Sequence, residues 1–225
     1  FCTETSCKVI DETFQIRGGR GFETSASLKG RGETGYAVER AYRDARVNLI
    51  IEGTSQIMRL FIAREALDPH FKRIEPILSS KTHMLKKIKL AISTGLYYTF
   101  WFPGLWLPCF VFPGAKDLPF PLKKHLKFVC AAARRLAREL FLNMLIHRQR
   151  LESKQNILSR FVDIGTDLFA ISAACSYAAS LVKQKNFHAE ASPVELAELF
   201  CCQARTRIAR NFKDVWREND AWKWN

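Results

Sequence analysis

Apolar side chains recur at helical spacing along most of this chain, and that period constrains its fold more than any other feature. In residues 123–150 one stripe comprises Leu126, Cys130, Ala133, Ala137, Leu140 and Met144. In residues 155–185 a second comprises Ile157, Phe161, Ile164, Leu168, Ile171 and Ala174. No segment alternates apolar and polar residues with the period of a strand. The sequence therefore predicts an all-α protein, with a helical bundle followed by a second helical domain.

Local signals place the other helices. Residues 1–16 read as a helix that ends at the glycines of "RGGRGF", and residues 23–37 have the composition of a loop. A short helix is expected over 38–47. Another should start after Thr54 and Ser55 and end at Pro69 or slightly past it. We also expect a helix over 81–92.

The last helix has a clear predicted start. Ser192 stands as N-cap, Pro193 at the first helical position and Glu195 three residues after the cap, which is a capping box.

Positive charge is concentrated in one part of the chain. The net charge is +13 over 225 residues, and residues 81–150 hold thirteen Lys and Arg against two acidic residues. Such a patch suits an anionic membrane surface or nucleic acid, or is simply a solvated helix face. No nucleic-acid reader motif is recognised, so we expect no nucleic-acid partner.

The seven cysteines include no C-x-x-C pair, and several lie inside apolar helical patterns. They are typical of reduced core cysteines in a cytosolic or matrix protein. The five histidines show no metal-ligand spacing with one another or with cysteine, so we predict no metal. The chain opens without Met and in what reads as the middle of a helix, which suggests a fragment of a longer protein.

Residues 90–115 contain no charged residue, and they carry Pro103, Pro108 and Pro113. The run is long enough to suggest a membrane span, but its prolines and glycines should break a straight helix. Trp and Tyr belong to membrane interfaces, and basic residues flank the run. We expect Trp101, Phe102 and Trp106 to contact a membrane by monotopic or re-entrant insertion. The alternative is a buried loop at a dimer interface.

The octet "IIEGTSQI" at 50–57 places one carboxylate, Glu52, directly after apolar residues. A desolvated carboxylate has a raised pKa and acts as a general base. The same residue would equally suit the exposed first turn of a helix, where an acid favours the helix dipole. The octet alone leaves both interpretations open.

Residues 15–67 resemble the carboxy-terminal helical domain of acyl-CoA dehydrogenases. The resemblance is carried by "QIRGGRGF" at 15–22 and by "VERAYRDARVNLIIEGTSQIMRLFIARE" at 38–65, in that order. It implies that Glu52 is the base that removes the α-proton of an acyl-CoA thioester while a hydride leaves the β-carbon for FAD. The backbone N–H of Glu52 and a flavin ribityl hydroxyl would stabilise the thioester oxygen, and Gly53 would let substrate approach closely.

The same resemblance implies two sets of FAD contacts. One set, which would reach the FAD of the neighbouring subunit of a homodimer, is Gln15, Ile16, Arg17, Gly18 and Gly19. The other, Thr54 and Gln56, would serve the adenosine end. A connection between "GGRGF" and "VER" that is longer than in short- and medium-chain members leaves the position of this loop over the site open.

Residues 153–181 look like the extra helical domain of the very-long-chain members, which are membrane-attached dimers. We accordingly expect three parts: 1–70, part of the family's C-terminal helical domain; 71–122, a membrane-associating connector; and 123–225, the extra helical domain. The implied partners are acyl-CoA, an electron-transfer flavoprotein, a second subunit and an anionic membrane surface.

The implied location is the cytoplasmic face of a bacterial membrane or the matrix face of the mitochondrial inner membrane. Because the family's amino-terminal and β-domains are missing, the chain alone should not be a competent enzyme. The alternative function is a catalytically incomplete, membrane-associated scaffold or interaction protein.

Overall fold

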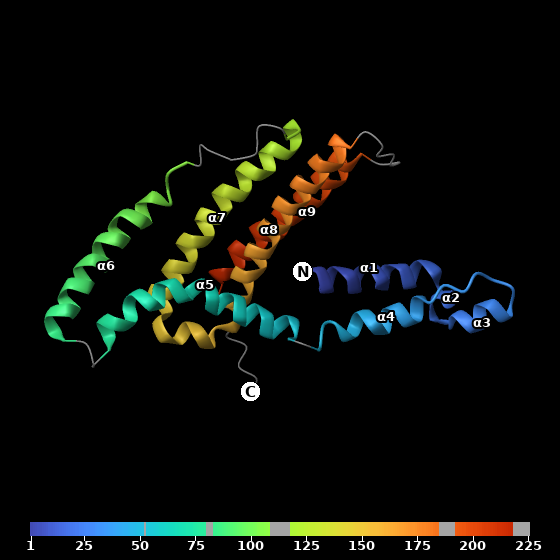
Figure 1. Cartoon of the computed structure of the whole chain (residues 1–225), viewed down its shortest axis with the longest axis horizontal. Coiled ribbons are helices and arrows are strands. Elements are labelled where there is room, and N and C mark those ends of the chain that lie inside the picture. Colours follow the sequence, from blue (N-terminus) through green and yellow to red (C-terminus); the bar gives the residue numbers. More distant parts are fainter. Residues whose placement is uncertain (52, 80–82, 109–117, 185–191, 218–225) are drawn as a thin grey trace. The chain divides into compact units, whose positions relative to one another are not determined.

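The computed structural model describes residues 1–51, 53–79, 83–108, 118–184 and 192–217. Within these ranges the secondary structure is helical and contains no strand, so the prediction of an all-α fold is confirmed. The chain divides into two compact units, residues 1–61 and residues 62–225 (Figure 1). The predicted division into three parts at residues 70 and 122 stays a prediction.

The first unit is built on a pair of antiparallel helices. Its elements are α1 (Cys2–Arg17), α2 (Gly19–Phe22), α3 (Ser25–Gly30), α4 (Val38–Val47) and the start of α5 (Ser55–Leu78). The Phe14 and Tyr42 rings are 5.5 Å apart, and the Cys7 thiol donates to the Ala45 carbonyl at 3.1 Å, so α1 packs against α4. The predicted helices over 1–16 and 38–47 are confirmed.

A short helix, α3, lies inside the segment predicted to be a loop. Thr24 caps it by accepting a hydrogen bond from the Ser27 amide at 3.2 Å, and its Leu28 is fully buried. Burial of Leu28 therefore gives order to a segment whose Ser, Thr and Gly content predicts none. The loop prediction is wrong for residues 25–30.

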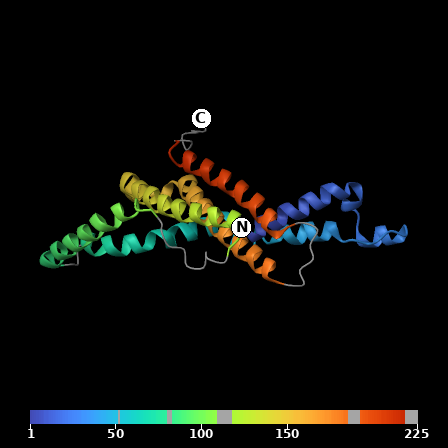
Figure 2. The ribbon, with the colours of Figure 1, turned by 90° about the horizontal axis from the view of Figure 1, so that it is seen from above.

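Among its described residues, the second unit contains the rest of α5 and further helices (Figures 1 and 2). These are α6 (Met84–Gly104), α7 (Phe120–His147), the 3₁₀ helix η2 (Arg148–Ser153), α8 (Gln155–Lys183) and α9 (Pro193–Val215). α7, α8 and α9 pack together, and fully buried side chains such as Ile164, Ile171 and Ile208 fill the space between them. Complete burial of one such side chain stabilises the fold by about 1.5–3 kcal/mol.

Two helices run further than the sequence predicts. α5 continues through Pro69 and Pro76 to Leu78, because the turns after Pro69 are held by packing: His70 contacts aromatic rings and Ile74 packs on the core. α6 continues past residue 92 to Gly104, with Pro103 in its last turn. Pro69 thus does not end α5, whereas α6 ends directly after Pro103, as the prolines of this run predict. Pro113 lies outside the described residues.

α9 begins as predicted, with Ser192 as N-cap and Pro193 first, but the Ser192 hydroxyl makes no capping hydrogen bond. The capping-box prediction is therefore only half right. The cysteine prediction also needs correction: Cys2, Cys7, Cys175, Cys201 and Cys202 are free thiols, whereas Cys130 is disulfide-bonded.

Candidate active site and cofactor-binding segments

The turn between α4 and α5 carries the predicted catalytic position. Glu52 itself lies outside the described residues. Gly53 directly after it has φ +106°, a conformation that L side chains rarely adopt, and a Cβ on Gly53 would stand 3.0 Å from the Met58 sulfur. Thr54 then caps α5, its hydroxyl accepting from the Ile57 amide at 3.3 Å. The turn thus requires glycine at 53 and a capping hydroxyl at 54.

Apolar side chains flank this turn, but they are exposed to solvent. Ile50, Ile51 and Ile57 have exposed fractions of 56%, 57% and 59%. A water-poor environment is what raises the basicity of a carboxylate. The first unit supplies apolar side chains for such an environment, but these side chains do not shield the turn from water.

The predicted flavin segment 15–19 forms the end of α1. Gly18 has φ +56°, its amide donates to the Gln15 carbonyl at 3.1 Å, and a Cβ on Gly18 or Gly19 would meet nothing within 4 Å. Ile16 is 84% exposed. No packing requirement in the structure explains glycine at 19, and bare backbone facing open space is what close approach of a dinucleotide needs. The segment therefore fits the cofactor that the sequence predicts.

Arg17 is the half-buried cation of this segment. Its guanidinium lies 4.8 Å from the centre of the Tyr36 ring, and its Nε is buried without a hydrogen-bond partner. An unpartnered buried donor is costly unless a bound group satisfies it. Beside it, the hydrogen bond from Arg20 at 2.7 Å lowers the pKa of Glu33, which stays ionised.

The two predicted cofactor groups lie at opposite ends of the α1–α4 pair. Near one end Glu4 forms an ion pair with Arg59 at 2.9 Å, close to Thr54 and Gln56. Near the other end Arg17 meets Tyr36. Because α1 has 16 residues, the two ends are roughly 24 Å apart. The structure brings Gly53, Thr54 and Gln56 together in one turn and keeps the 15–19 group away from them.

The predicted membrane residues separate into two kinds. Trp101 and Phe102 turn inward and are half-buried, with ring centres 5.6 and 5.5 Å from that of Phe141 on α7. Trp106 is 67% exposed and lies under the Arg138 guanidinium at 4.2 Å. Whether any of the three contacts a membrane stays a prediction.

A different face of α6 is apolar and exposed. Its members are Leu85, Ile88, Ile92, Leu96 and Phe100, at 50–76% exposure. Their spacing of three and four residues is a helical signal present in the sequence, and it lies on other positions than the predicted membrane residues. Lys86, Lys87 and Lys89 lie on the same helix.

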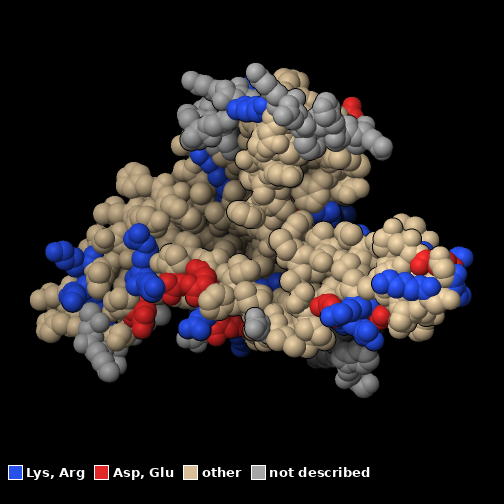
Figure 3. Space-filling view, turned by 45° about the vertical axis from the view of Figure 1, so that its right-hand side comes forward, with Lys and Arg blue, Asp and Glu red and all other residues tan. Residues whose placement is uncertain are grey.

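The basic residues of α7 are largely engaged within the protein. Arg134 and Arg138 donate to the Leu107 and Leu105 carbonyls just after α6, the second at 2.6 Å, and Lys124 pairs with Glu198. Figure 3 shows acidic residues beside basic ones at several places on the displayed face, with uncharged surface between them. Fewer of the basic side chains are therefore free to form one positive patch than the residue counts suggest.

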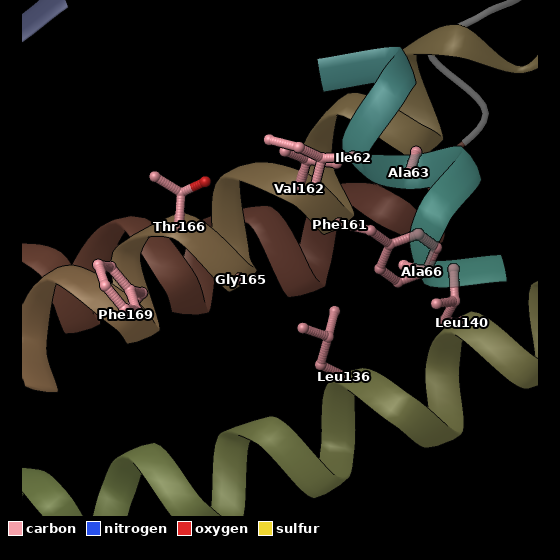
Figure 4. Close-up of a pocket in the computed structure, with 10 residues that line it drawn as sticks. All are labelled: Ile62, Ala63, Ala66, Leu136, Leu140, Phe161, Val162, Gly165, Thr166 and Phe169. Carbon is pink, nitrogen blue, oxygen red and sulfur yellow. The ribbon is translucent and has the colours of Figure 1, made fainter. Parts of the chain in front are cut away.

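An apolar hollow of about 310 Å³ lies between α5, α7 and α8 in the second unit (Figure 4). Its lining is Ile62, Ala63, Ala66, Leu136, Leu140, Phe161, Val162, Gly165, Thr166 and Phe169. Only the Thr166 side chain offers a hydrogen bond, so the hollow does not suit a phosphate-bearing cofactor.

Among the described residues no group of three His, Cys, Asp or Glu side chains is placed to hold a metal ion. In the same part of the chain, α8 alone is long and apolar enough to cross a membrane by length and composition. Its buried face forms the core against α7 and α9, as a core helix does.

Comparison with known proteins finds family matches for two parts of the chain. Residues 1–67 match the family model "Acyl-CoA dehydrogenase, C-terminal domain", and residues 122–224 match "ACAD9/ACADV, C-terminal domain". The probable acyl-CoA dehydrogenase FadE10 of Mycobacterium tuberculosis is 42% identical over 97% of this chain and 34% of its own length.

Two further relatives are more distant. The mitochondrial very long-chain specific acyl-CoA dehydrogenase of Rattus norvegicus is 28% identical over 96% of this chain and 31% of its own length. A probable acyl-CoA dehydrogenase of Bacillus subtilis is 25% identical over 95% and 31%. The chain spans about a third of the length of the curated relatives that it matches. By these matches and its all-α fold, the chain belongs to the acyl-CoA dehydrogenase family and comprises sequence of its two carboxy-terminal domains.

Proposed function

We propose that this chain serves a FAD-dependent acyl-CoA dehydrogenase that oxidises long-chain acyl-CoA thioesters in fatty-acid β-oxidation. The observation that carries the proposal is the match of residues 1–67 to the family's C-terminal domain, with Glu52 placed directly before the left-handed Gly53 and the cap of α5. The rat relative, named very long-chain specific, supports the substrate class. The activity is proposed for a polypeptide of the relatives' length.

In this proposal Glu52 removes the proton from the α-carbon of the thioester. Its backbone N–H donates to the thioester oxygen, where negative charge develops as the α-proton leaves. Gly53 keeps this backbone open to substrate because it carries no side chain. Bound FAD would supply the acceptor for the β-hydrogen, which leaves as hydride.

Two groups of residues would hold FAD, and their separation supports a homodimer. Thr54 and Gln56 lie in the same turn as Gly53, while Gln15, Ile16, Arg17, Gly18 and Gly19 lie at the far end of α1. A single chain with groups roughly 24 Å apart suits contacts to two cofactors, one of them in a neighbouring subunit. The Arg17 donor without a partner would then meet an acceptor on that cofactor.

The test is Glu52→Gln in the FAD-loaded holoenzyme. Anaerobic palmitoyl-CoA should bleach the flavin of the unaltered enzyme, and the variant should bleach about a thousandfold more slowly, because a positioned general base contributes 10²–10⁴-fold. Glu12→Gln, an exposed carboxylate on α1, is the matched control and should bleach normally. Flavin absorbance confirms that each variant still holds FAD. Equal bleaching in both variants would refute the role of Glu52.

We further propose that the exposed face of α6 docks on an anionic membrane, either the cytoplasmic face in a bacterium or the matrix face in a mitochondrion. The supporting observation is the row of exposed apolar side chains from Leu85 to Phe100, beside the lysines at 86, 87 and 89. Apolar insertion plus basic charge is the composition of an interfacial helix. An electron-transfer flavoprotein would take the electrons from the reduced cofactor.

Vesicle flotation tests this second proposal. Vesicles with phosphatidylglycerol should carry the protein and pure phosphatidylcholine vesicles should not. Leu96→Ser with Phe100→Ser should weaken flotation at least tenfold, whereas Ser93→Ala, another exposed change on α6, should not. Flotation that ignores anionic lipid would refute the proposal.

The same α6 face favours a second candidate function. A protein that binds a membrane or partner through α6 without catalysis would be a scaffold, and α6 docking does not depend on Glu52. Normal flotation together with no bleaching in the unaltered holoenzyme would favour it.

A further inference from the structure

Two buried cysteines meet between α8 and α9. The Cys175 and Cys201 sulfurs are 3.7 Å apart, and both residues have an exposed fraction of 0%. Each cysteine lies eight residues from the loop that joins the two helices, since α8 ends at Lys183 and α9 starts at Pro193.

The pair has the chemistry of a nucleophile with a resolving partner. The Cys201 thiol bonds to the Cys175 sulfur, which lowers the pKa of Cys175, while the same bond and burial raise the pKa of Cys201. Cys175 is therefore the sulfur that ionises first. A disulfide needs about 2.05 Å between sulfurs, so a side-chain rotation and a small approach of the helices would suffice.

We propose that Cys175 and Cys201 form an oxidative modification site, in which hydrogen peroxide converts the dithiol into a disulfide that joins α8 to α9. This site is independent of the proposed dehydrogenase activity. It involves no residue of the candidate active site.

The atoms and electrons balance with peroxide as the oxidant. The Cys175 thiolate attacks one peroxide oxygen, the O–O bond breaks, and the departing hydroxide takes up a proton as water, leaving Cys175 as sulfenic acid. The Cys201 sulfur then attacks the Cys175 sulfur, the S–O bond breaks, and the hydroxyl leaves as water with the Cys201 proton. Two electrons pass from the thiols to peroxide.

Peroxide reaches the pair when the hairpin opens locally. Ends of helical hairpins open at lower free energy than the whole domain, and the pair is two turns from the end. Cys202 is exposed but is the direct neighbour of Cys201, and adjacent helical residues do not face the same direction. The fold therefore directs the bridge to Cys175 rather than to Cys202.

The test is a two-label cysteine map of the reduced full chain after peroxide treatment. The chain is denatured with N-ethylmaleimide, then reduced and labelled with iodoacetamide. Cys175 and Cys201 should take the second label in equal amounts, and an unreduced digest should contain their linked peptides. If both take the first label, or Cys201 is bridged to Cys202, or Cys175 reaches sulfinic acid while Cys201 stays a thiol, the proposal is wrong.

Two variants sharpen the result. Cys202→Ser is the matched control and should keep the bridge. Cys201→Ser should stop at the Cys175 sulfenic acid, which dimedone captures. If this variant does not fold, the map of the unaltered chain and of Cys202→Ser still decides, and oxidation in guanidinium should give mixed pairings because the fold no longer selects one.

Discussion

Apolar side chains differ in exposure between two regions of the molecule, the turn between α4 and α5 and the α8–α9 hairpin. Ile50, Ile51 and Ile57 at the turn are more than half exposed, whereas Ile164 and Ile171 on α8 are 0% exposed. The hairpin side chains are buried in a core that they share with α7. The turn keeps apolar side chains outside, where they gain nothing until another surface covers them.

This difference separates structure from function along the chain. The hairpin core is already covered within the second unit, so substitutions there should act through folding. The turn carries the predicted base and needs a covering surface to exclude water from it. Substitutions of the exposed apolar side chains there should leave the fold nearly unchanged and act on catalysis.

The largest expected effect comes from truncating the hairpin core. Ile171→Ala should lower the free energy of unfolding of the second unit by about 3 kcal/mol, because a fully buried Ile loses its contacts and leaves a cavity. Ile57→Ala at the turn, 59% exposed, should change stability by less than about 0.5 kcal/mol. Urea unfolding followed by circular dichroism measures both. Equal costs for the two substitutions would break the comparison.

The sequence predicts the hairpin well because α8 is buried along a regular stripe. Ile157, Phe161, Ile164, Leu168 and Ile171 are all buried as expected. The buried stripe then continues at Cys175, whereas Ala174 was expected and is only half-buried. Cys175 keeps the alternating spacing of four and three residues along one helix face, which Ala174 does not.

The sequence predicts the buried face of α7 less well, for a physical reason. Ala133 of its expected stripe is exposed, while polar His125, Glu139 and Asn143 are buried. Glu139 is tolerated inside because Arg135 on the same helix pairs with it at 2.5 Å and Trp216, 77 residues away in sequence, donates to it at 3.0 Å. Partners so distant in sequence give no periodic signal. Polar residues therefore concealed the buried face.

At the candidate site the sequence indicates which residues matter but not where they lie. Gly53 and Thr54 have local roles in a turn, so their residue types predict their geometry. The separation of the 15–19 group from this turn depends on the antiparallel packing of α1 and α4. No local pattern encodes that packing.

The second prediction compares two glycines within the first unit. Gly53→Ala should destabilise this unit by about 2 kcal/mol, because φ +106° strains an L residue and the new Cβ would lie 3.0 Å from the Met58 sulfur. Gly19→Ala faces open space and should cost less than about 0.5 kcal/mol, yet it should weaken FAD retention in the holoenzyme. Unfolding curves and flavin absorbance after gel filtration measure the two effects. A stable Gly53→Ala variant would show that the turn is less constrained than the hairpin core.

The third and smallest effect tests a polar group inside the stable unit. His125 is fully buried and neither ring nitrogen has a hydrogen-bond partner. Its pKa is lowered by burial first and then by Arg205 and Lys124, with Glu198 acting in the opposite direction. His125→Leu removes an unsatisfied group of similar size, so it should raise the free energy of unfolding by about 1 kcal/mol at pH 7.

The pH dependence gives the sign of this effect. A histidine whose pKa is lower in the folded state than the ordinary value near 6.5 binds more protons when unfolded, so stability is full above pH 6.5 and falls as the pH drops below it. The advantage of His125→Leu should therefore grow between pH 7 and pH 5, while His70, whose pKa is also lowered by burial, still gives both proteins some acid sensitivity. Urea unfolding at several pH values measures this difference. A gap that stays constant with pH would mean that His125 is not held neutral by the fold, and that the second unit is less closed to water than the hairpin core implies.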